Sequence, residues 1–267
     1  MKKVSPSQKQ LLNQVEYGRQ KHEKLQGQHR DMKKVSKNGK PVIRRDERDI
    51  KRAVGALEIK VALREKDMLI KEIQHRVINH LNLIYNILYF QKHYIEDSRC
   101  IAMLESTQKR IKSIALVHEH LNRSIDFNQV RFAEYIKSLL KENMRAADVA
   151  KKKVTLKTKI DAVSVDLTTA ITCGLIVNEL MDNSLKHAFP DNRPAEIFIG
   201  LKDQKDGTYA ITVSDNGIGL PSKVQWHLSN TLGSFLVNTL TENLRGELTV
   251  NVNNGTSFHL RFGSLPQ

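Results

Sequence analysis

The sequence is poor in the features that build secreted or membrane-spanning proteins. Only two of its 267 residues are cysteine, Cys100 and Cys173, and neither belongs to a Cys-x-x-Cys pair or has a histidine at metal-binding spacing. A disulfide framework and a zinc site therefore find no support. No run of about 18 apolar residues exists, and the N-terminal MKKVSPSQKQ lacks the apolar centre of a signal peptide. We expect a soluble protein in a reducing cytoplasm.

Acidic residues are scarce at the N-terminus. The formal net charge is +14, and residues 1–53, with 16 Lys and Arg against 6 Asp and Glu, contribute +10 of it. Such a segment can contact nucleic acid or an anionic surface. Because no motif for base recognition accompanies the charge, a solvated basic linker or helix face is the favoured interpretation. Nucleic-acid binding is the weaker one.

Glycine and proline are absent from a long stretch of the N-terminal half. Neither occurs between Gly55 and about Lys92, and the pattern from Asp49 onward is helical. A second helix is expected from EDSR, residues 96–99, to about Asn122. Two long helices with a short connection predict an antiparallel hairpin, which would form a four-helix bundle if two chains paired.

Two histidines in EIQHRVINHLNLIYNIL, residues 72–88, fall on different sides of the first helix. On a helical wheel with ~100° per residue, His75 lies on a polar stripe and His80 lies at the edge of an apolar seam. We therefore expect His75 to be exposed and His80 to pack beside the seam. The expected seam residues are Ile73, Val77, Leu81, Ile84 and Leu88.

Beyond about Ile125, helical and strand-like spacings mix. Helices are expected at residues 131–143, 168–188 and 232–243. Strand-like alternation begins in five places, at Val154, Ile197, Tyr209, Leu248 and Phe258. The predicted fold class is α+β, in which helices cover one face of a sheet.

The segment NELMDNSLKHAFP, residues 178–190, places four polar residues on one side of a helix. They are Glu179, Asn183, Lys186 and His187. The amide oxygen of Asn183 suits Mg²⁺, and the cation of Lys186 offsets phosphate charge. An ordinary polar helix face is the alternative.

The segment TVSDNGIGLP, residues 212–221, ends a strand-like run at Asp215. Gly217 and Gly219 allow the backbone to approach a flat ligand. The carboxylate of Asp215 can accept a hydrogen bond from an exocyclic amine such as that of adenine. Ordinary turn chemistry is the alternative.

Two later segments complete a pattern. TLGSFLVNTL, residues 231–240, puts Gly233 before a helix whose amides can hold phosphate, and NNGTSFHLRF, residues 253–262, puts Gly255 and Thr256 at the start of a strand. In this order the segments resemble the N, G1 and G2 boxes of the GHKL ATPase superfamily, shared by histidine kinases, gyrase-type topoisomerases and Hsp90 chaperones. HRVINHLNLI, residues 75–84, resembles the phosphoacceptor box of two-component sensor histidine kinases of the class related to HWE kinases. The resemblance covers about residues 49–262.

The resemblance implies a role for each of these residues. His75 becomes the phosphorylated histidine, Glu179 the catalytic N-box acid, and Asn183 the amide that holds Mg²⁺. The implied nucleotide-binding set adds Asn178, which stands where HWE kinases proper usually carry His. It also adds Lys186 and His187 near the phosphates, Asp215 at the adenine amine, Gly217 and Gly219 in the adenine pocket, Gly233 in the phosphate lid, and Gly255 with Thr256, which supports the aspartate through water. Ile78 and His80 replace the usual Lys and Asn of the acceptor box, and Arg245 replaces the first Gly of a common pair.

The implied activity is that of an ATP-dependent protein-histidine kinase. It would phosphorylate His75 from Mg-ATP and pass the phosphoryl group to an aspartate of a response-regulator receiver domain. A histidine phosphotransfer or scaffold protein with a non-catalytic GHKL domain is the alternative. A serine kinase of the anti-sigma type would lack the helical hairpin.

The expected organisation has three parts. Residues 1–48 form a basic segment that is the remnant or linker of a sensor, residues 49–125 form the dimerisation and phosphotransfer hairpin, and residues 126–267 form a Bergerat-type α/β sandwich that binds ATP. A homodimer is expected, with a monomer as the alternative. Because residues 1–48 are too few for a PAS domain, sensory input is expected from a separate protein or from a part that this sequence does not contain.

Overall fold

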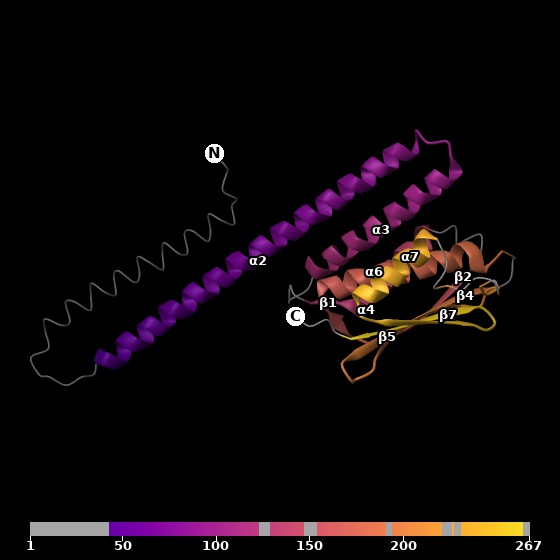
Figure 1. Ribbon diagram of the computed structural model, residues 1–267. Helices are drawn as coiled ribbons and strands as arrows, with labels where there is room; N and C mark the ends of the chain where they lie inside the picture. Colours follow the sequence, from indigo (N-terminus) through magenta and orange to yellow (C-terminus); the bar gives the residue numbers. More distant parts are fainter. Residues whose placement is uncertain are drawn as a thin grey trace, which may run out of the picture. The chain divides into compact units, whose positions relative to one another are not determined.

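The computed structural model describes residues 43–122, 129–146, 154–190, 194–220, 226 and 231–263. The chain divides into two compact units, Met1–Ala62 and Leu63–Gln267, and the second contains the sheet and the helices that cover it (Figure 1). The side chains of the predicted basic segment 1–48 lie outside the described residues. None of the described helices combines the length and the apolar character that a membrane span requires.

Helix α2 (Ile43–Lys92) and helix α3 (Ser98–Asn122) follow one another after a short turn. The turn ends at Asp97, whose Oδ1 accepts hydrogen bonds from the backbone N–H groups of Cys100 at 3.0 Å and Arg99 at 2.7 Å. These bonds to Cys100 and Arg99 lower the pKa of Asp97, which caps the first turn of α3.

Three polar contacts set the register between α2 and α3. They join Gln74 to His118, the Tyr85 carbonyl to Gln108, and Lys92 to Glu105. The residue numbers rise along α2 as they fall along α3, so the helices are antiparallel, as predicted. His75 therefore lies at the level of His118, near the far end of α3 from the turn.

The predicted apolar seam of α2 is partly wrong. Ile73 and Ile84 are 57% and 46% exposed. The stripe of α2 that bonds to α3 passes through Gln74 and Tyr85 instead, at about 100° to 120° from Ile73 on a helical wheel. The three seam residues nearest this stripe are half-buried: Val77, Leu81 and Leu88.

The position of the buried stripe also determines how exposed the two histidines of α2 are. His75 is exposed, as predicted. His80 is also exposed, so the expectation that it packs beside the seam is wrong for this chain. On the wheel His80 lies about 20° outside Ile73, on the side away from the buried stripe.

A five-stranded sheet forms one layer of the second unit, in the order β2-β4-β5-β7-β6. Its strands are β2 (Val154–Ile160), β4 (Ala195–Asp203), β5 (Thr208–Asp215), β6 (Glu247–Val252) and β7 (Thr256–Gly263). β2 and β4 are parallel, which requires a crossover connection, whereas the other pairs are antiparallel. A separate short pair joins β1 (Val130–Arg131) to β3 (Ser164–Val165).

Helices cover one face of this sheet (Figure 1). They are α4 (Phe132–Ala146), α6 (Leu167–Asn183) and α7 (Leu232–Asn243). β4 alternates buried and half-exposed side chains along most of its length, as expected for a strand whose one face contacts the helices. The predicted α+β fold, with helices on one face of the sheet, is confirmed.

Helix α6 supplies the crossover between β2 and β4. Asp166 caps its N-terminus by accepting the Thr169 backbone N–H at 2.9 Å. The predicted single helix 168–188 changes type after Asn183 and continues as the π-helix η1 (Ser184–Ala188). A π-turn is wider than an α-turn and is frequent at functional sites.

One tyrosine joins three helices behind the site. A Cβ atom added to Gly174 of α6 would lie 1.8 Å from Tyr135 Oη, so only glycine lets the ring of Tyr135 pack there. The same Oη lies 3.1 Å from Ser113 Oγ on α3. Burial raises the pKa of Tyr135, which keeps its hydroxyl neutral. α3, α4 and α6 thus meet at one buried ring.

Candidate functional site

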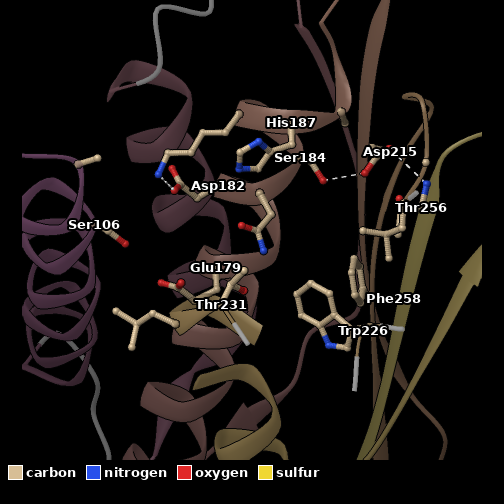
Figure 2. Close-up of a pocket in the computed structure, with 18 of the residues that line it drawn as sticks. Ser106, Glu179, Asp182, Ser184, His187, Asp215, Trp226, Thr231, Thr256 and Phe258 are labelled. Atoms are coloured by element: carbon tan, nitrogen blue, oxygen red, sulfur yellow. Dashed lines mark hydrogen bonds and ion pairs between the residues drawn. The ribbon is translucent and has the colours of Figure 1, made fainter. Parts of the chain in front are cut away.

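A cavity of about 660 Å³ opens between α6, η1, the adjoining strand ends and α3 (Figure 2). Its size suits a ligand as large as a nucleotide. The sequence-predicted residues that line it are Glu179, Asn183, Lys186, His187, Asp215, Gly219, Gly233 and Thr256. Residues almost eighty positions apart in the sequence therefore meet at one site.

Asp215 lies at the inner end of the cavity, at the last position of β5. Its Oδ1 accepts the backbone N–H groups of Gly217 at 3.0 Å and Thr256 at 3.2 Å, and its Oδ2 accepts the hydroxyl of Ser184 at 2.8 Å (Figure 2). Thr256 is the register partner of Asp215 on β7. Thr256 therefore holds the carboxylate directly through its backbone N–H, and the further support through water that the resemblance implies stays a prediction.

Two glycines let the loop after β5 lie against η1 and the start of β7. A Cβ atom on Gly217 would lie 2.3 Å from the Ala188 carbonyl oxygen, and one on Gly255 would lie 1.9 Å from the Asp215 carbonyl oxygen. Both distances are far below a van der Waals contact. Neither glycine lines the cavity itself, but both fix the backbone that carries Asp215.

Apolar side chains form the wall beside Asp215. The rings of Trp226 and Phe258 pack edge to face with their centroids 4.7 Å apart. The exposed side chains of Ile218 and Leu232 also line the cavity. The buried Trp226 Nε1 has no hydrogen-bond partner within the described part of the chain. A flat base fits such an apolar wall.

The opposite end of the cavity is polar. Asn183 ends α6, and Lys186 and His187 follow on η1. Gly233, in the first turn of α7, faces this end, since a Cβ there would lie 3.4 Å from Glu179 Oε2 and 3.8 Å from Asn183 Nδ2. Cations, an amide and a helix N-terminus suit phosphate groups. The described residues contain no cluster of three or more His, Cys, Asp or Glu that would hold a metal by itself.

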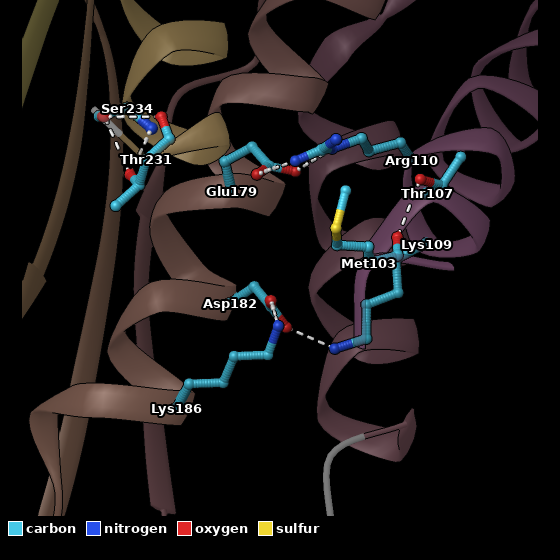
Figure 3. A network of polar contacts seen from close by, with 9 residues as sticks. All are labelled: Met103, Thr107, Lys109, Arg110, Glu179, Asp182, Lys186, Thr231 and Ser234. Atoms are coloured by element: carbon cyan, nitrogen blue, oxygen red, sulfur yellow. Dashed lines mark hydrogen bonds and ion pairs between the residues drawn. The ribbon is translucent and has the colours of Figure 1, made fainter. Parts of the chain in front are cut away.

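Helix α3 forms the remaining wall through ion pairs that the sequence did not suggest (Figure 3). Arg110 holds Glu179 with two hydrogen bonds, Nε to Oε1 and Nη2 to Oε2, both 2.8 Å long. The side chains are only 16% and 7% exposed. The hydrogen bonds to Glu179 raise the pKa of Arg110. Each carboxylate oxygen of Glu179 thus accepts one hydrogen bond from α3.

A second set of ion pairs lies beside the first. Asp182 accepts from Lys109 of α3 and from Lys186 of η1 (Figure 3). Burial opposes ionisation of Asp182, but the hydrogen bonds from the two lysines outweigh it, so the pKa of Asp182 is lowered. Charge pairs thus tie α3 to α6 along one edge of the cavity.

Besides Gly217 and Gly255, two further predicted site residues do not line the cavity. Asn178 is 2% exposed and is not among the residues that line the cavity. His75 lies on α2, at the level of His118 on α3. His118 follows Arg110 by eight residues, which corresponds to about 12 Å along the helix axis. The exposed His75 is therefore separated from the cavity in this arrangement.

The sequence alone did not identify Ser184, Asp182 or Arg110. The sequence feature that could have identified Ser184 is its position directly after Asn183, where its hydroxyl extends the polar stripe of the helix. Arg110 stands in QKRIKS, where several cations occur together and nothing distinguishes the one that meets Glu179.

Comparison with known protein families assigns both halves of the second unit. Residues 72–147 match the family described as histidine kinase. Residues 168–265 match the family described as histidine kinase-, DNA gyrase B-, and HSP90-like ATPase. An ATPase domain of this family implies ATP binding.

Curated relatives and solved structures agree with these assignments. The sensor histidine kinase PdtaS of Mycobacterium tuberculosis is 30% identical over 203 residues, which are 76% of this chain and 39% of that protein. The blue-light-activated histidine kinase 2 of Erythrobacter litoralis is 26% identical over 191 residues, 70% of this chain and 54% of that protein. The chain thus spans about half or less of the length of these relatives. The histidine kinase domain of the Erythrobacter litoralis EL346 blue-light activated kinase shares the fold, with a TM-score of 0.58 at 24% identity over 74% of this chain and 91% of that one.

Proposed function

The chain joins a histidine kinase domain to a histidine kinase-, DNA gyrase B- and HSP90-like ATPase domain, and from this premise we propose that it transfers the γ-phosphoryl group of ATP to His75. The observation that carries the proposal is the cavity. It places Asp215, Asn183 and Lys186 together, and the same chain presents the exposed His75 on its hairpin. A phosphotransfer or scaffold protein without ATP chemistry would not need these groups around one cavity.

The site has an orientation for ATP. Asp215 and the apolar wall of Trp226 take the adenine, and Lys186 and Asn183 take the phosphates. Mg²⁺, where bound through the Asn183 amide oxygen, would neutralise phosphate charge. The apolar wall and the paired Asp215 orient the base, and positioning of the reactants supplies most of the catalysis.

In the transfer step a nitrogen of the neutral His75 imidazole attacks the γ-phosphorus. A P–N bond forms, the P–O bond to the β-phosphate breaks, and ADP leaves with the electron pair of that bond. The ring proton of His75 passes to a base. Glu179 is the base we propose, once its carboxylate is free of Arg110.

The ion pairs between α3 and α6 then oppose the reaction within this chain. They hold Glu179 on Arg110 and keep the cavity next to α3, about 12 Å along the hairpin from the level of His75. Phosphorylation therefore requires the α3–α6 contact to open, so that Glu179 is released and the cavity can reach a His75 of the same chain or of a second copy.

A second copy also fits the exposed face of α2. Leu83, Ile87 and Phe90 are all large, apolar and exposed on this helix. We propose that they pair two hairpins into a four-helix bundle. The phosphohistidine would donate to an aspartate of a response-regulator receiver domain, and the reaction would draw its ATP from the cytoplasm.

A labelling experiment tests the proposal. The purified chain, given ATP labelled at the γ-phosphate and Mg²⁺, should gain acid-labile phosphate, and His75→Gln should gain none. His80→Gln is the matched control, because His80 is also exposed on α2, and it should keep its label. An unlabelled parent, or a His75→Gln variant that labels as well as the parent, would refute the proposal.

A further inference from the structure

We propose that Ser184 is a positioning residue that makes the inner end of the cavity select a 6-amino purine. The inference rests on the proposed function, in which ATP is the ligand. Ser184 is buried, lines the cavity and donates its hydroxyl proton to Asp215 Oδ2 at 2.8 Å (Figure 2).

The direction of this hydrogen bond follows from its partners. Both donors on Asp215 Oδ1, the backbone N–H groups of Gly217 and Thr256, require an acceptor, and an ionised carboxylate can only accept. Ser184 must therefore be the donor to Oδ2. Its single proton is used, and only the lone pairs of its oxygen remain.

Asp215 and Ser184 consequently present only acceptors to the inner end of the cavity. Asp215 Oδ2 keeps one free lone-pair direction, and Ser184 Oγ adds its own. An amino group at position 6 of a purine donates to such a pair. An oxo group at position 6 would place its lone pairs against those of Asp215 Oδ2 and Ser184 Oγ. These acceptors would then lack a donor from the ligand, which weakens binding.

The hydroxyl of Ser184 does not make the hydrogen bond that is usual for a serine in a helix. A serine in a helix often bonds to the carbonyl four residues earlier. Here the hydroxyl instead crosses to β5, thirty-one residues away in sequence. The wider turn of η1 begins at this residue. The hydroxyl therefore sets the rotation of the carboxylate, and Gly217 and Thr256 hold its other oxygen.

The test pairs a change in the protein with a change in the ligand. Dissociation constants are measured by calorimetry for ATP and for purine riboside 5′-triphosphate, which carries hydrogen at position 6. Ser184→Ala should weaken ATP about tenfold and leave the hydrogen analogue within about twofold of the parent. Ser184→Thr, which keeps the hydroxyl, should restore most of the ATP affinity. Inosine 5′-triphosphate, with its oxo group, should bind the parent more weakly than ATP, and Ser184→Ala should narrow that difference.

Thr172→Ala is the matched control. Thr172 also carries a buried hydroxyl on α6, but it bonds to the Thr168 carbonyl at 2.8 Å and does not line the cavity. Its nucleotide affinities should equal those of the parent. If Ser184→Ala weakens ATP and the hydrogen analogue equally, or weakens neither, the inference is overturned while the proposed kinase activity stands. If the parent binds no ATP, the proposed function fails first and the inference with it.

Discussion

The two sides of α6 hold their neighbours by different means. Toward the sheet, Asp215 is fixed by a serine hydroxyl and two backbone N–H groups whose positions follow from strand register. Toward α3, Glu179 and Asp182 are held by long cationic side chains of a separate helix. The first set belongs to the fold of the ATPase domain. The second set can separate without disturbing a strand, which suits the opening of this contact in the proposed phosphoryl transfer.

The largest effect should come from Arg110→Ala. It leaves the Glu179 carboxylate, 7% exposed, without its partner, and breaking one side of a buried pair costs about 3–5 kcal/mol. Urea denaturation should therefore show a lower free energy of unfolding. The double variant Arg110→Ala, Glu179→Gln should recover much of the loss, because no buried charge remains. Equal losses in the single and double variants would show that the two side chains are not coupled.

The sequence predicts the sheet side of α6 far better than the α3 side. Strand periodicity and the position of Asp215 before two glycines are local features, so they could be read from the chain. The partner of Glu179 depends on how two helices pack, and Arg110 has no local mark among its neighbouring cations. The prediction of the α2 seam was partly wrong for the same reason, since contacts with α3 determine which stripe of α2 is buried. Arg245, which replaces an expected glycine, adopts a φ of 49°. The backbone therefore has the positive φ that favours glycine, although the residue is an arginine.

Acid should weaken the contact between α3 and α6 by protonating Asp182, and the free energy of unfolding should fall with it. Its pKa is lowered from 3.8 in the folded chain, so the unfolded chain binds the proton first as the pH falls. The stabilisation is therefore complete above about pH 5 and is lost as the pH drops through 4 and below. Asp182→Asn removes this carboxylate, and the free energy of unfolding should then decline less steeply between pH 5 and pH 3. Asp206→Asn is the control for an exposed carboxylate with a lowered pKa that does not contact α3. Identical slopes for Asp182→Asn and the parent would contradict the role given to this residue.

The smallest effect is expected for Lys112→Ala, two residues after Arg110 on the same helix. Lys112 pairs with Glu142 of α4, but the two side chains are 54% and 34% exposed. Water solvates both charges after the change, so the free energy of unfolding should fall by no more than about 0.5 kcal/mol. Lys157→Ala, which breaks a similarly exposed pair with Glu196 on the sheet, should behave alike. A loss at Lys112 as large as that at Arg110 would contradict the expectation that burial decides how much each charge pair of α3 contributes to stability.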